Sequence, residues 1–414
     1  MVDRQARTDR RHVVGKLPIQ GVDRGGLEQR NQARGSENGN VTAPLLDRGV
    51  GRGDDKACLP SELGIGGKWF DASIVDPCRA GDYRSDAYFV NDMPRLMTHP
   101  IDHLGGLIVS KGPRRLRFFA DGWGDPDHLG DLGLSVTRPD PVHIDWVHQR
   151  SDNGFVTATG IFDSPVKAIL PGRSRRAALT RVAPAEPADR VVVLMAAWNE
   201  HDSRGRFGIA RRLAQRGITS LVLENPYYGI RRSGEGQPIR TVADFARMGT
   251  GAVEEGRALL ATIRRDGNTP GVAGYSMGGN IAALISATLP FPVATAPMAP
   301  AHSPAPVYLD GALRRGIDWE ALGGEEEAAP RLRSFMLRAS VCTVDPVDHT
   351  RHAILVAAES DGYVPREATE ILHRHWPGSE VRWVSGGHAS LFWLGKRLMA
   401  DAIVDAFERL ERVE

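Results

Sequence analysis

The stretch Thr269–Leu289 constrains the fold more than any other part of the sequence. An apolar extended run passes there into a helical pattern with almost no loop between them. The run ends at Gly274, Ser276 stands at the corner, and the helical pattern begins at once. A corner this tight forces Ser276 into a strained backbone conformation, and Gly274 and Gly278 remove the Cβ atoms that would collide there. The serine hydroxyl is therefore expected at a strand end, beside a helix N-terminus whose dipole favours negative charge.

The pattern Gly-x-Ser-x-Gly carries little information by itself, because this chain has 46 glycines in 414 residues. The alternative interpretation is a glycine-rich turn before a packed helix. A serine hydroxyl is a poor nucleophile at neutral pH and needs a base within hydrogen-bond reach, which an acid must orient. Partners elsewhere in the chain therefore decide between the two readings of Ser276.

Composition excludes several classes of protein. The 52 basic residues are matched by 51 acidic ones, so the net charge of +1 gives no reason to expect a nucleic-acid partner. Cys58, Cys78 and Cys342 form neither a disulfide framework nor a metal-ligand spacing, which favours a cytoplasmic protein. No apolar run is long enough to span a membrane and no secretory signal is recognisable, so membrane contact is expected to be peripheral.

The chain divides into two parts by its patterning. Residues 1–92 are rich in Arg, Gly, Asp and Asn without a helical or strand period, which predicts a disordered or non-native N-terminal extension. Met93 and Met97 are alternative starts. One domain is expected over residues 93–414, and the aromatic side chains of Arg117–Leu129 are expected to pack against it.

The domain begins with β patterning and then alternates between strands and helices. Three antiparallel strands are predicted, over Val142–His148, Gly154–Phe162 and Ala177–Ala183. Later strands are predicted over Arg190–Ala197, Thr219–Glu224, Thr269–Gly274, Pro292–Ala299, Ala353–Glu359 and Glu380–Val384, and helices over Arg204–Gly217, Val242–Arg265, Glu367–His375 and Leu391–Leu410. This alternation predicts an α/β fold with a mainly parallel sheet covered by helices on both faces, and a short lid insertion over about 300–346.

An acid and a histidine follow Ser276 in the order found in α/β-hydrolases. Asp361 comes 85 positions after Ser276 (361 minus 276), and His388 comes 27 positions after Asp361 (388 minus 361). Each follows a predicted strand, so both are expected at the sheet edge that carries Ser276. Glu359 is the alternative acid, and the alternative histidines are His373 and His375 on an amphipathic helix. No grouping has metal-ligand spacing, and the chemistry requires no cofactor.

Two backbone amides are candidates for stabilising an oxyanion. Met277 N–H stands at the helix N-terminus beside Ser276, and the second donor is expected after the strand Arg190–Ala197, from Trp198 or Ala197. Three tyrosines at strand ends are candidate substrate-binding residues: Tyr227, Tyr228 and Tyr275. For Tyr227 and Tyr228 the alternative is aromatic packing in the turn.

The residues also resemble a known family, the α/β-hydrolase domain-containing protein 18 family. The likeness runs from about Phe118 to the C-terminus and rests on separate motifs: Leu221–Arg232, Gly274–Gly279, Asp361–Arg366, Trp376–Gly378 and Gly386–His388. The resemblance implies an α/β-hydrolase fold, puts the family's Ser, Asp and His on Ser276, Asp361 and His388, and suggests phospholipid acyl esters as a substrate class. The chain departs from the family pattern at Ala196–Asn199, where the family is richer in glycine.

The leading hypothesis is a serine hydrolase that cleaves a carboxylic ester of a small molecule or lipid. The altered loop at Ala196–Asn199 keeps open a catalytically silent binding protein of the same fold, because loss of an oxyanion donor would cost about 3 kcal/mol of transition-state stabilisation. An acyltransferase, or a perhydrolase, could use the same three residues, and exclusion of water from the site would favour transfer.

A truncation tests the expected domain boundary. A chain that begins at Met93 should fold and keep its esterase activity, because residues 1–92 hold no partner for Ser276 and no patterned core. The melting temperature and p-nitrophenyl ester hydrolysis of the two forms are compared. Insolubility, or loss of activity in a folded truncated chain, would show that the segment packs on the domain.

Overall fold

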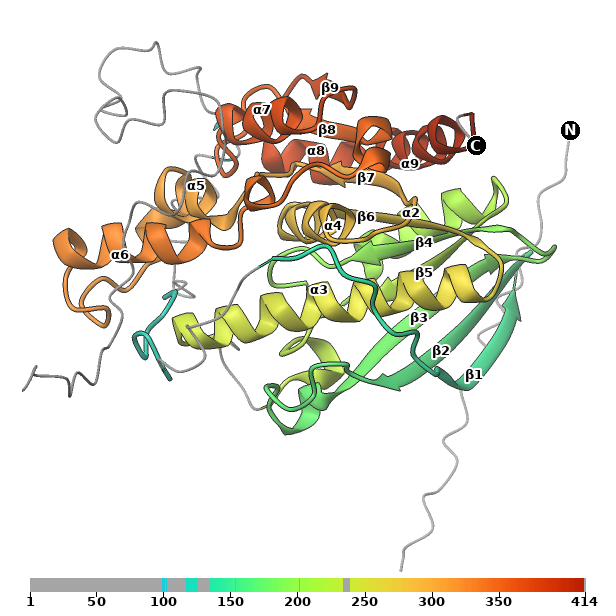
Figure 1. Cartoon of the computed structure of the whole chain (residues 1–414), viewed down its shortest axis with the longest axis horizontal. Helices are drawn as coiled ribbons and strands as arrows, with labels where there is room; N and C mark the ends of the chain where they lie inside the picture. Colours follow the sequence, from blue (N-terminus) through green and yellow to red (C-terminus); the bar gives the residue numbers. More distant parts are fainter. Residues whose placement is uncertain are drawn as a thin grey trace, which may run out of the picture. The chain divides into compact units, whose positions relative to one another are not determined.

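The structure is a computed structural model that describes residues 99–100, 102, 117–125, 134–152, 154–200, 202–233 and 239–412 (Figure 1). The extension predicted over residues 1–92 lies outside the described residues. None of the helices in the described part is both long enough and apolar enough to cross a bilayer.

One sheet of nine strands organises the domain, in the order β1-β2-β3-β5-β4-β6-β7-β8-β9. The predicted antiparallel edge is confirmed by β1 (Asp145–Asp152), β2 (Phe155–Asp163) and β3 (Arg176–Pro184), and β3 also pairs antiparallel with β5 (Ile218–Leu223). The remaining strands run parallel to β5: β4 (Arg190–Met195), β6 (Thr269–Tyr275), β7 (Ala294–Met298), β8 (Ile354–Ala358) and β9 (Glu380–Val384). Their carboxyl ends therefore share one edge of the sheet.

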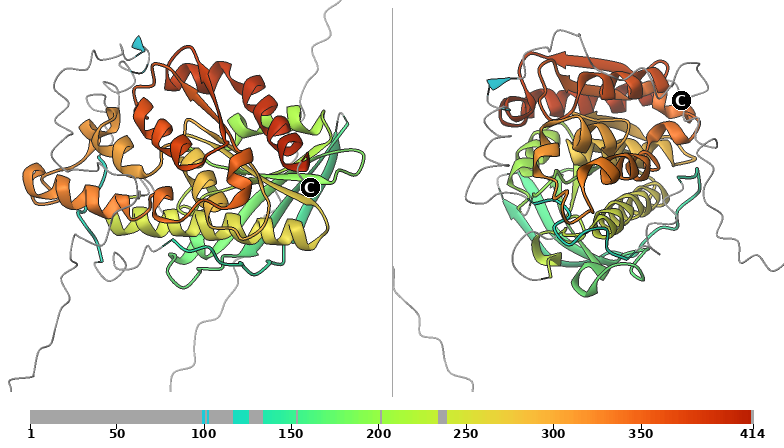
Figure 2. Two further views of the ribbon diagram at one scale, coloured as in Figure 1. Left: turned by 45° about the horizontal axis from the view of Figure 1, so that its top comes forward. Right: turned by 90° about the vertical axis from the view of Figure 1, so that its left-hand side faces the viewer.

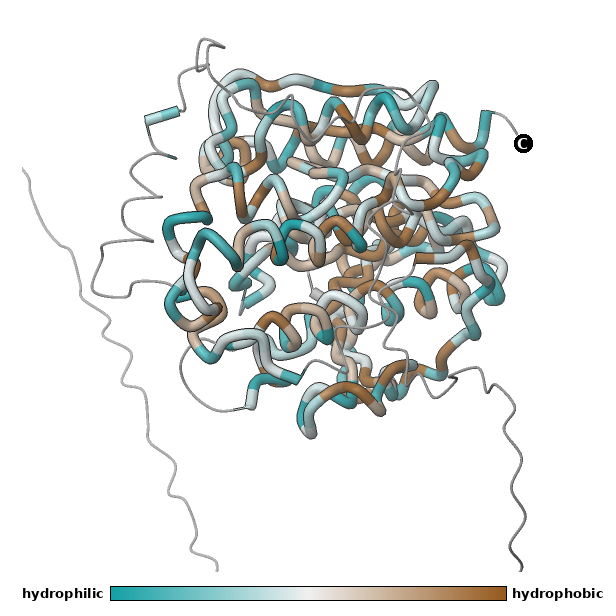
Figure 3. The backbone as a smooth tube through the Cα atoms, turned by 60° about the vertical axis from the view of Figure 1, so that its left-hand side comes forward, coloured by the Kyte–Doolittle hydropathy of each residue, from teal (hydrophilic) through white to brown (hydrophobic). Residues whose placement is uncertain are grey.

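Helices cover both faces of this sheet (Figure 2). Along β4, Val191, Val193 and Met195 belong to the apolar cluster that includes α3 (Val242–Arg265) and α4 (Met277–Ala287). Val192 and Leu194 point to the opposite face and pack in the cluster of α2 (Arg204–Ala214) and α9 (Lys396–Glu411). Because successive strand side chains alternate between faces, a continuous apolar run is what a strand covered on both sides needs. Figure 3 shows hydrophobic residues concentrated in the central elements.

The segment predicted as a lid insertion contains two helices, α5 (Pro304–Leu309) and α6 (Glu325–Leu337). They lie at the end of α3 that begins at Val242 (Figure 1). Phe118 and Phe119 are buried in the same apolar cluster, at 0% and 1% exposure, which confirms that the aromatic side chains of this segment pack on the domain. The remaining elements are short: η3 (Gly172–Arg175), η4 (Gly229–Arg231), η5 (Ala312–Gly316), η6 (Val341–Thr343), η7 (Asp348–His352), α7 (Arg366–His375) and α8 (His388–Leu394).

The closing helix predicted over Leu391–Leu410 is wrong as a single element. The structure has α8 and α9 there, separated at Gly395. A Cβ at Gly395 would collide with the carbonyl oxygen of Leu391, so the chain turns at the residue that lacks one. The first of these helices also begins before the predicted one, at His388.

A buried ion pair fixes the loop that follows β5. Arg231 binds both carboxylate oxygens of Glu255 in α3, at 2.8 and 2.6 Å, and the two side chains are 1% and 0% exposed. Its guanidinium also donates to the carbonyl oxygens of Glu224 and Ser174, each at 2.6 Å. The two terminal nitrogens of Arg231 thus donate four hydrogen bonds and tie the loop to both α3 and η3, while its Nε has no partner among the described residues.

Removal of one charge from this pair should be costly. We expect Glu255→Gln to lower the free energy of unfolding by about 3–5 kcal/mol, because Arg231 would keep a buried and uncompensated charge. The matched control is Asp310→Asn in the surface pair with Arg333, whose side chains are 45% and 42% exposed; its expected cost is about 0–1 kcal/mol. Urea denaturation gives both values, and equal losses would contradict the assignment of Arg231 and Glu255 as the stabilising pair.

Candidate active site

Ser276 stands at the corner between β6 and α4, as the sequence predicted. Its backbone dihedral angles are φ 57° and ψ −120°, a conformation that costs a non-glycine residue about 1–3 kcal/mol. The surroundings impose it, since Ser276 N–H donates to Met298 O of β7 at 2.8 Å and a Cβ at Gly278 would lie 2.5 Å from Met195 O. The strand end and the helix start are therefore held in close contact, with the serine side chain projecting from the corner.

Three side chains from three loops form a continuous line of hydrogen bonds. His388 Nε2 lies 2.9 Å from Ser276 Oγ, and His388 Nδ1 lies 2.7 Å from Asp361 Oδ2. The other oxygen of Asp361 accepts the N–H groups of Tyr363 and Val364, each at 2.8 Å. Only 12% of the His388 side chain and 5% of the Asp361 side chain are exposed. The carboxylate is thus fixed in one orientation and the imidazole faces the hydroxyl.

The alternative residues are engaged elsewhere. Glu359 accepts a hydrogen bond from Ser385 Oγ at 3.0 Å and does not contact His388. His373 Nδ1 lies 2.8 Å from Ser379 Oγ, and His375 Nε2 lies 2.9 Å from Val344 O. Within the described ranges, no cluster of three or more His, Cys, Asp and Glu residues could hold a metal ion.

Opposing effects act on the imidazole of His388. Burial lowers the pKa of His388, but the negative charge of Asp361, its hydrogen bond and the charge of Asp102 together raise the pKa above its usual value. The site therefore stabilises the imidazolium, which is the form His388 would take after removing a proton from Ser276.

The loop after β4 carries the candidate second oxyanion donor. Ala197 N–H donates to Glu200 Oε2 at 3.0 Å, and Arg206 holds the other oxygen of Glu200 at 2.8 Å. Of the two predicted donors, the amide of Ala197 is therefore engaged, which leaves that of Trp198. On the opposite side, Met277 is the first residue of α4, where backbone N–H groups have no intrahelical acceptor.

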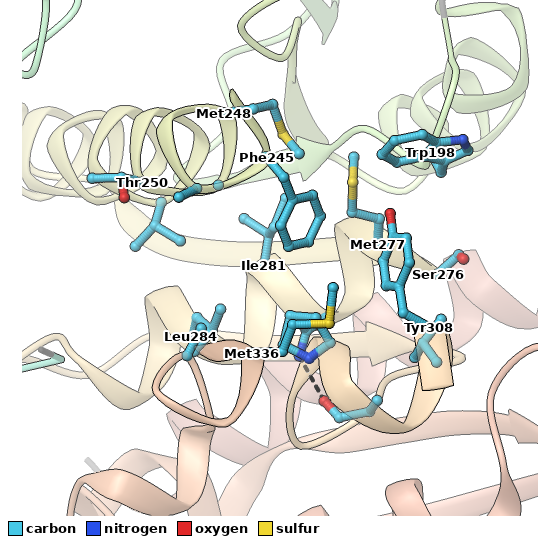
Figure 4. A pocket seen from close by; sticks show the side chains of 18 of the residues that line it. Trp198, Phe245, Met248, Thr250, Ser276, Met277, Ile281, Leu284, Tyr308 and Met336 are labelled. Atoms are coloured by element: carbon cyan, nitrogen blue, oxygen red, sulfur yellow. Dashed lines mark hydrogen bonds between the residues drawn. The ribbon is translucent and has the colours of Figure 1, made fainter. Parts of the chain in front are cut away.

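An apolar cavity of about 180 Å³ opens beside Ser276. Figure 4 shows Ser276 and Trp198 toward one side of it and Thr250 and Leu284 toward the other. Most of the lining side chains are apolar or aromatic, and they come from α3, α4, α5 and α6: Phe245, Met248, Ile281, Leu284, Val307, Tyr308, Phe335 and Met336. The insertion thus forms one wall of the cavity. Sequence patterning located α3 and α4 but did not identify the cavity residues, because an amphipathic period does not reveal which apolar positions leave a space between helices.

The three tyrosines predicted to bind substrate do not line this cavity. Tyr227 is 7% exposed and its hydroxyl donates to Asp244 Oδ1 at 3.1 Å. Tyr228 is 0% exposed, with its ring edge against Trp198 at a centroid distance of 6.3 Å. Tyr275 donates its hydroxyl to His388 O at 2.5 Å, and its ring lies 5.0 Å from the imidazole. All three are therefore buried side chains that pack around the loops of the site. For Tyr227 and Tyr228 this agrees with the alternative of aromatic packing.

A known protein family matches most of this chain. A model of the family described as alpha/beta hydrolase domain containing 18 matches residues 116–340 and 325–409. Among solved structures, the chain is similar to a cold-adapted esterase from an Arctic intertidal metagenomic library, at 14% identity over 62% of this chain and 99% of that chain, with a TM-score of 0.41. It is also similar to acetyl xylan esterase 1 from Thermoanaerobacterium sp., at 12% identity over 68% and 99% of the two chains, with a TM-score of 0.43. It is similar as well to an S-formylglutathione hydrolase from Agrobacterium tumefaciens, at 13% identity over 64% of this chain and 99% of that chain, with a TM-score of 0.38. At such identities the substrates named for these proteins do not extend to this chain.

Proposed function

The chain belongs to the alpha/beta hydrolase domain containing 18 family, as its motifs indicated, and we propose that it is a serine hydrolase that cleaves a carboxylic ester. Ser276 Oγ attacks the ester carbonyl while His388 Nε2 takes the hydroxyl proton. The C–O bond to the alcohol then breaks, and His388 returns the proton to the leaving oxygen. Water, deprotonated by His388, releases the acid from Ser276 in the same manner.

The observation that carries this proposal is the geometry around His388. Its two ring nitrogens lie 2.9 Å from Ser276 Oγ and 2.7 Å from Asp361 Oδ2. A histidine that acts as general base must lie within about 2.6–3.2 Å of the oxygen atom whose proton it removes, and its second nitrogen must be held by an acceptor that fixes the tautomer. Asp361 meets that requirement, because its Oδ1 is held by the N–H groups of Tyr363 and Val364 while its Oδ2 faces the imidazole.

Stabilisation of the oxyanion is assigned to two backbone amides, those of Met277 and Trp198. They flank Ser276 from α4 and from the loop after β4, and both residues line the cavity. Each donor aimed at the developing negative charge contributes about 3–4 kcal/mol.

The cavity supports an acyl ester of a lipid or phospholipid as the substrate class. An aliphatic chain in contact with Phe245, Ile281 and Met336 would gain about 0.8 kcal/mol for each methylene group removed from water. A polar acyl group would lose its hydration against these side chains without replacement hydrogen bonds. The ester carbonyl would lie at Ser276 with the acyl chain directed along α4.

The nucleophile is tested by substitution. Ser276→Ala should lose all labelling by a fluorophosphonate probe and lower p-nitrophenyl ester hydrolysis by about 10⁴-fold or more, because no other hydroxyl lies beside His388 Nε2 among the described residues. Ser385→Ala is the matched control, since its hydroxyl binds Glu359 and not the reacting groups. Labelling of Ser276→Ala at the wild-type rate would remove Ser276 from this role, and a silent binding protein would show no labelling in any form.

The acyl cavity is tested by filling its far part. Leu284→Trp should leave acetyl ester hydrolysis near the wild-type rate and reduce kcat/KM for long-chain p-nitrophenyl esters. Exclusion of about two methylene groups corresponds to about 1.6 kcal/mol, or roughly 15-fold. Leu394→Trp makes the same change at a position that is 84% exposed and serves as the control. A uniform loss across all chain lengths in Leu284→Trp would place the acyl chain elsewhere.

A further inference from the structure

Asp102 is a buried carboxylate that belongs to none of the elements of the sheet or its covering helices. It is 0% exposed. Its two oxygens accept three backbone N–H groups, from Gly362 at 3.0 Å, His388 at 2.6 Å and Ala389 at 2.9 Å. No sequence pattern singled out this residue, because nothing in the stretch around it indicates which distant amides it would reach.

These amides belong to the two loops that carry the acid and the base. Gly362 directly follows Asp361, and His388 is the base itself. One oxygen of Asp102, Oδ2, receives both the Gly362 and the His388 N–H groups, so a single atom joins the two loops. The residues near Asp102 are also attached to the first loop, since His99 N–H donates to Ser360 O at 3.1 Å.

The space for this carboxylate is provided by Gly387. A Cβ at Gly387 would collide with Asp102 Oδ2 and with His99 Cβ. Gly387 has an extended backbone, with φ −114° and ψ −175°, so conformation alone does not require glycine at this position. The close approach of Asp102 explains it. Gly387 also has no side-chain acceptor of its own for the first amides of α8, and Asp102 supplies that acceptor from another part of the chain.

We propose that Asp102 is a positioning residue that fixes the Asp361 and His388 loops in register, so that the imidazole stays aligned between Asp361 and Ser276. This inference rests on the proposed serine-hydrolase function. The hydrogen bond between His388 and Asp361 depends on the separation of two loops from different strands, and Asp102 spans that separation with backbone contacts on both sides. A misplacement of about 1 Å at such a site costs about 10²-fold in rate.

The negative charge of Asp102 also acts on the pKa of His388. The groups that face the imidazole are Asp361, Asp102, Ser276, and the phenol groups of Tyr275 and Tyr363, whose rings each lie 5.0 Å from the imidazole. Burial lowers the pKa of His388, while the Asp361 and Asp102 charges raise it to a net value above normal. Loss of either negative charge should therefore lower the pKa of His388, and the pH at which it becomes neutral should fall.

The test uses the full chain with Asp102→Asn. Asparagine has one acceptor oxygen, so it cannot serve all three amides, and its NH₂ group would face a donor. We expect the rate of fluorophosphonate labelling of Ser276 to fall by about 10- to 100-fold at neutral pH. The acidic limb of the labelling rate against pH should move to lower pH. NMR titration of ¹³C-labelled histidine, with His388 assigned by its absence in His388→Gln, should show the same shift.

Two further variants separate positioning from general damage. Glu359→Gln removes a carboxylate that links the same pair of loops through Ser385 without touching His388, and it should leave both the labelling rate and the His388 titration unchanged. Gly387→Ala retains the Asp102 charge but displaces the carboxylate by steric collision, and it should lower the labelling rate. If Asp102→Asn does not fold, the labelling rate of Gly387→Ala still tests the proposal.

Each outcome is informative. Wild-type labelling rates in both folded Asp102→Asn and Gly387→Ala, with His388 titrating at the wild-type pH, would overturn the assignment while leaving Ser276 as the nucleophile. Failure of the wild-type protein to react with the probe would instead refute the proposed function. The titration of His388 would then still decide whether Asp102 controls the imidazole.

Discussion

The site depends on the close approach of backbones around the start of α4. Gly278 lies so near the end of β4 that a Cβ would stand 2.5 Å from Met195 O, and Gly279 lies against Met298 of β7 in the same way. This contact leaves no room for an ordinary turn, so Ser276 takes up the reversal with φ 57°. The strain is maintained because the sheet on both sides is buried and closely packed.

From that corner the rest of the site is built by parallel topology. Strands β6, β8 and β9 end at the same edge, and the loops after them bring Ser276, Asp361 and His388 into one line. The loops are joined by backbone hydrogen bonds, including Ser360 N–H to Gly386 O at 2.9 Å. Because the side chain of Asp361 holds the imidazole and backbone N–H groups hold Asp361, little reorganisation would be needed in the proposed proton transfer.

The cavity wall and the candidate oxyanion loop share one group of aromatic side chains. The ring of Trp198 lies 5.2 Å from that of Phe118 and 6.2 Å from that of Tyr308 in α5. Tyr308 also packs against Phe245 of α3 at 5.3 Å. A change in the insertion would therefore reach both the apolar cavity and the loop that carries Trp198. The segment over residues 300–346 is thus connected to the Ser276 site through the packing of Tyr308 against Trp198.

The sequence by itself predicted the strand, corner and helix around Ser276, from an apolar run that passes into a helical pattern with glycines on both sides of the serine. It also gave the bounds of α3, whose period is long and regular. It also favoured Asp361 over Glu359, a choice that matches the hydrogen bonds in the structure. The tertiary structure alone decided that Tyr227, Tyr228 and Tyr275 support the loops instead of lining the cavity, that the last helix divides at Gly395, and that the carboxylate of Asp102 lies against the His388 loop. The reason is physical: backbone strain and periodicity are local and can be recognised from neighbouring residues. A contact between residues 286 positions apart depends on how the whole sheet brings its loops together.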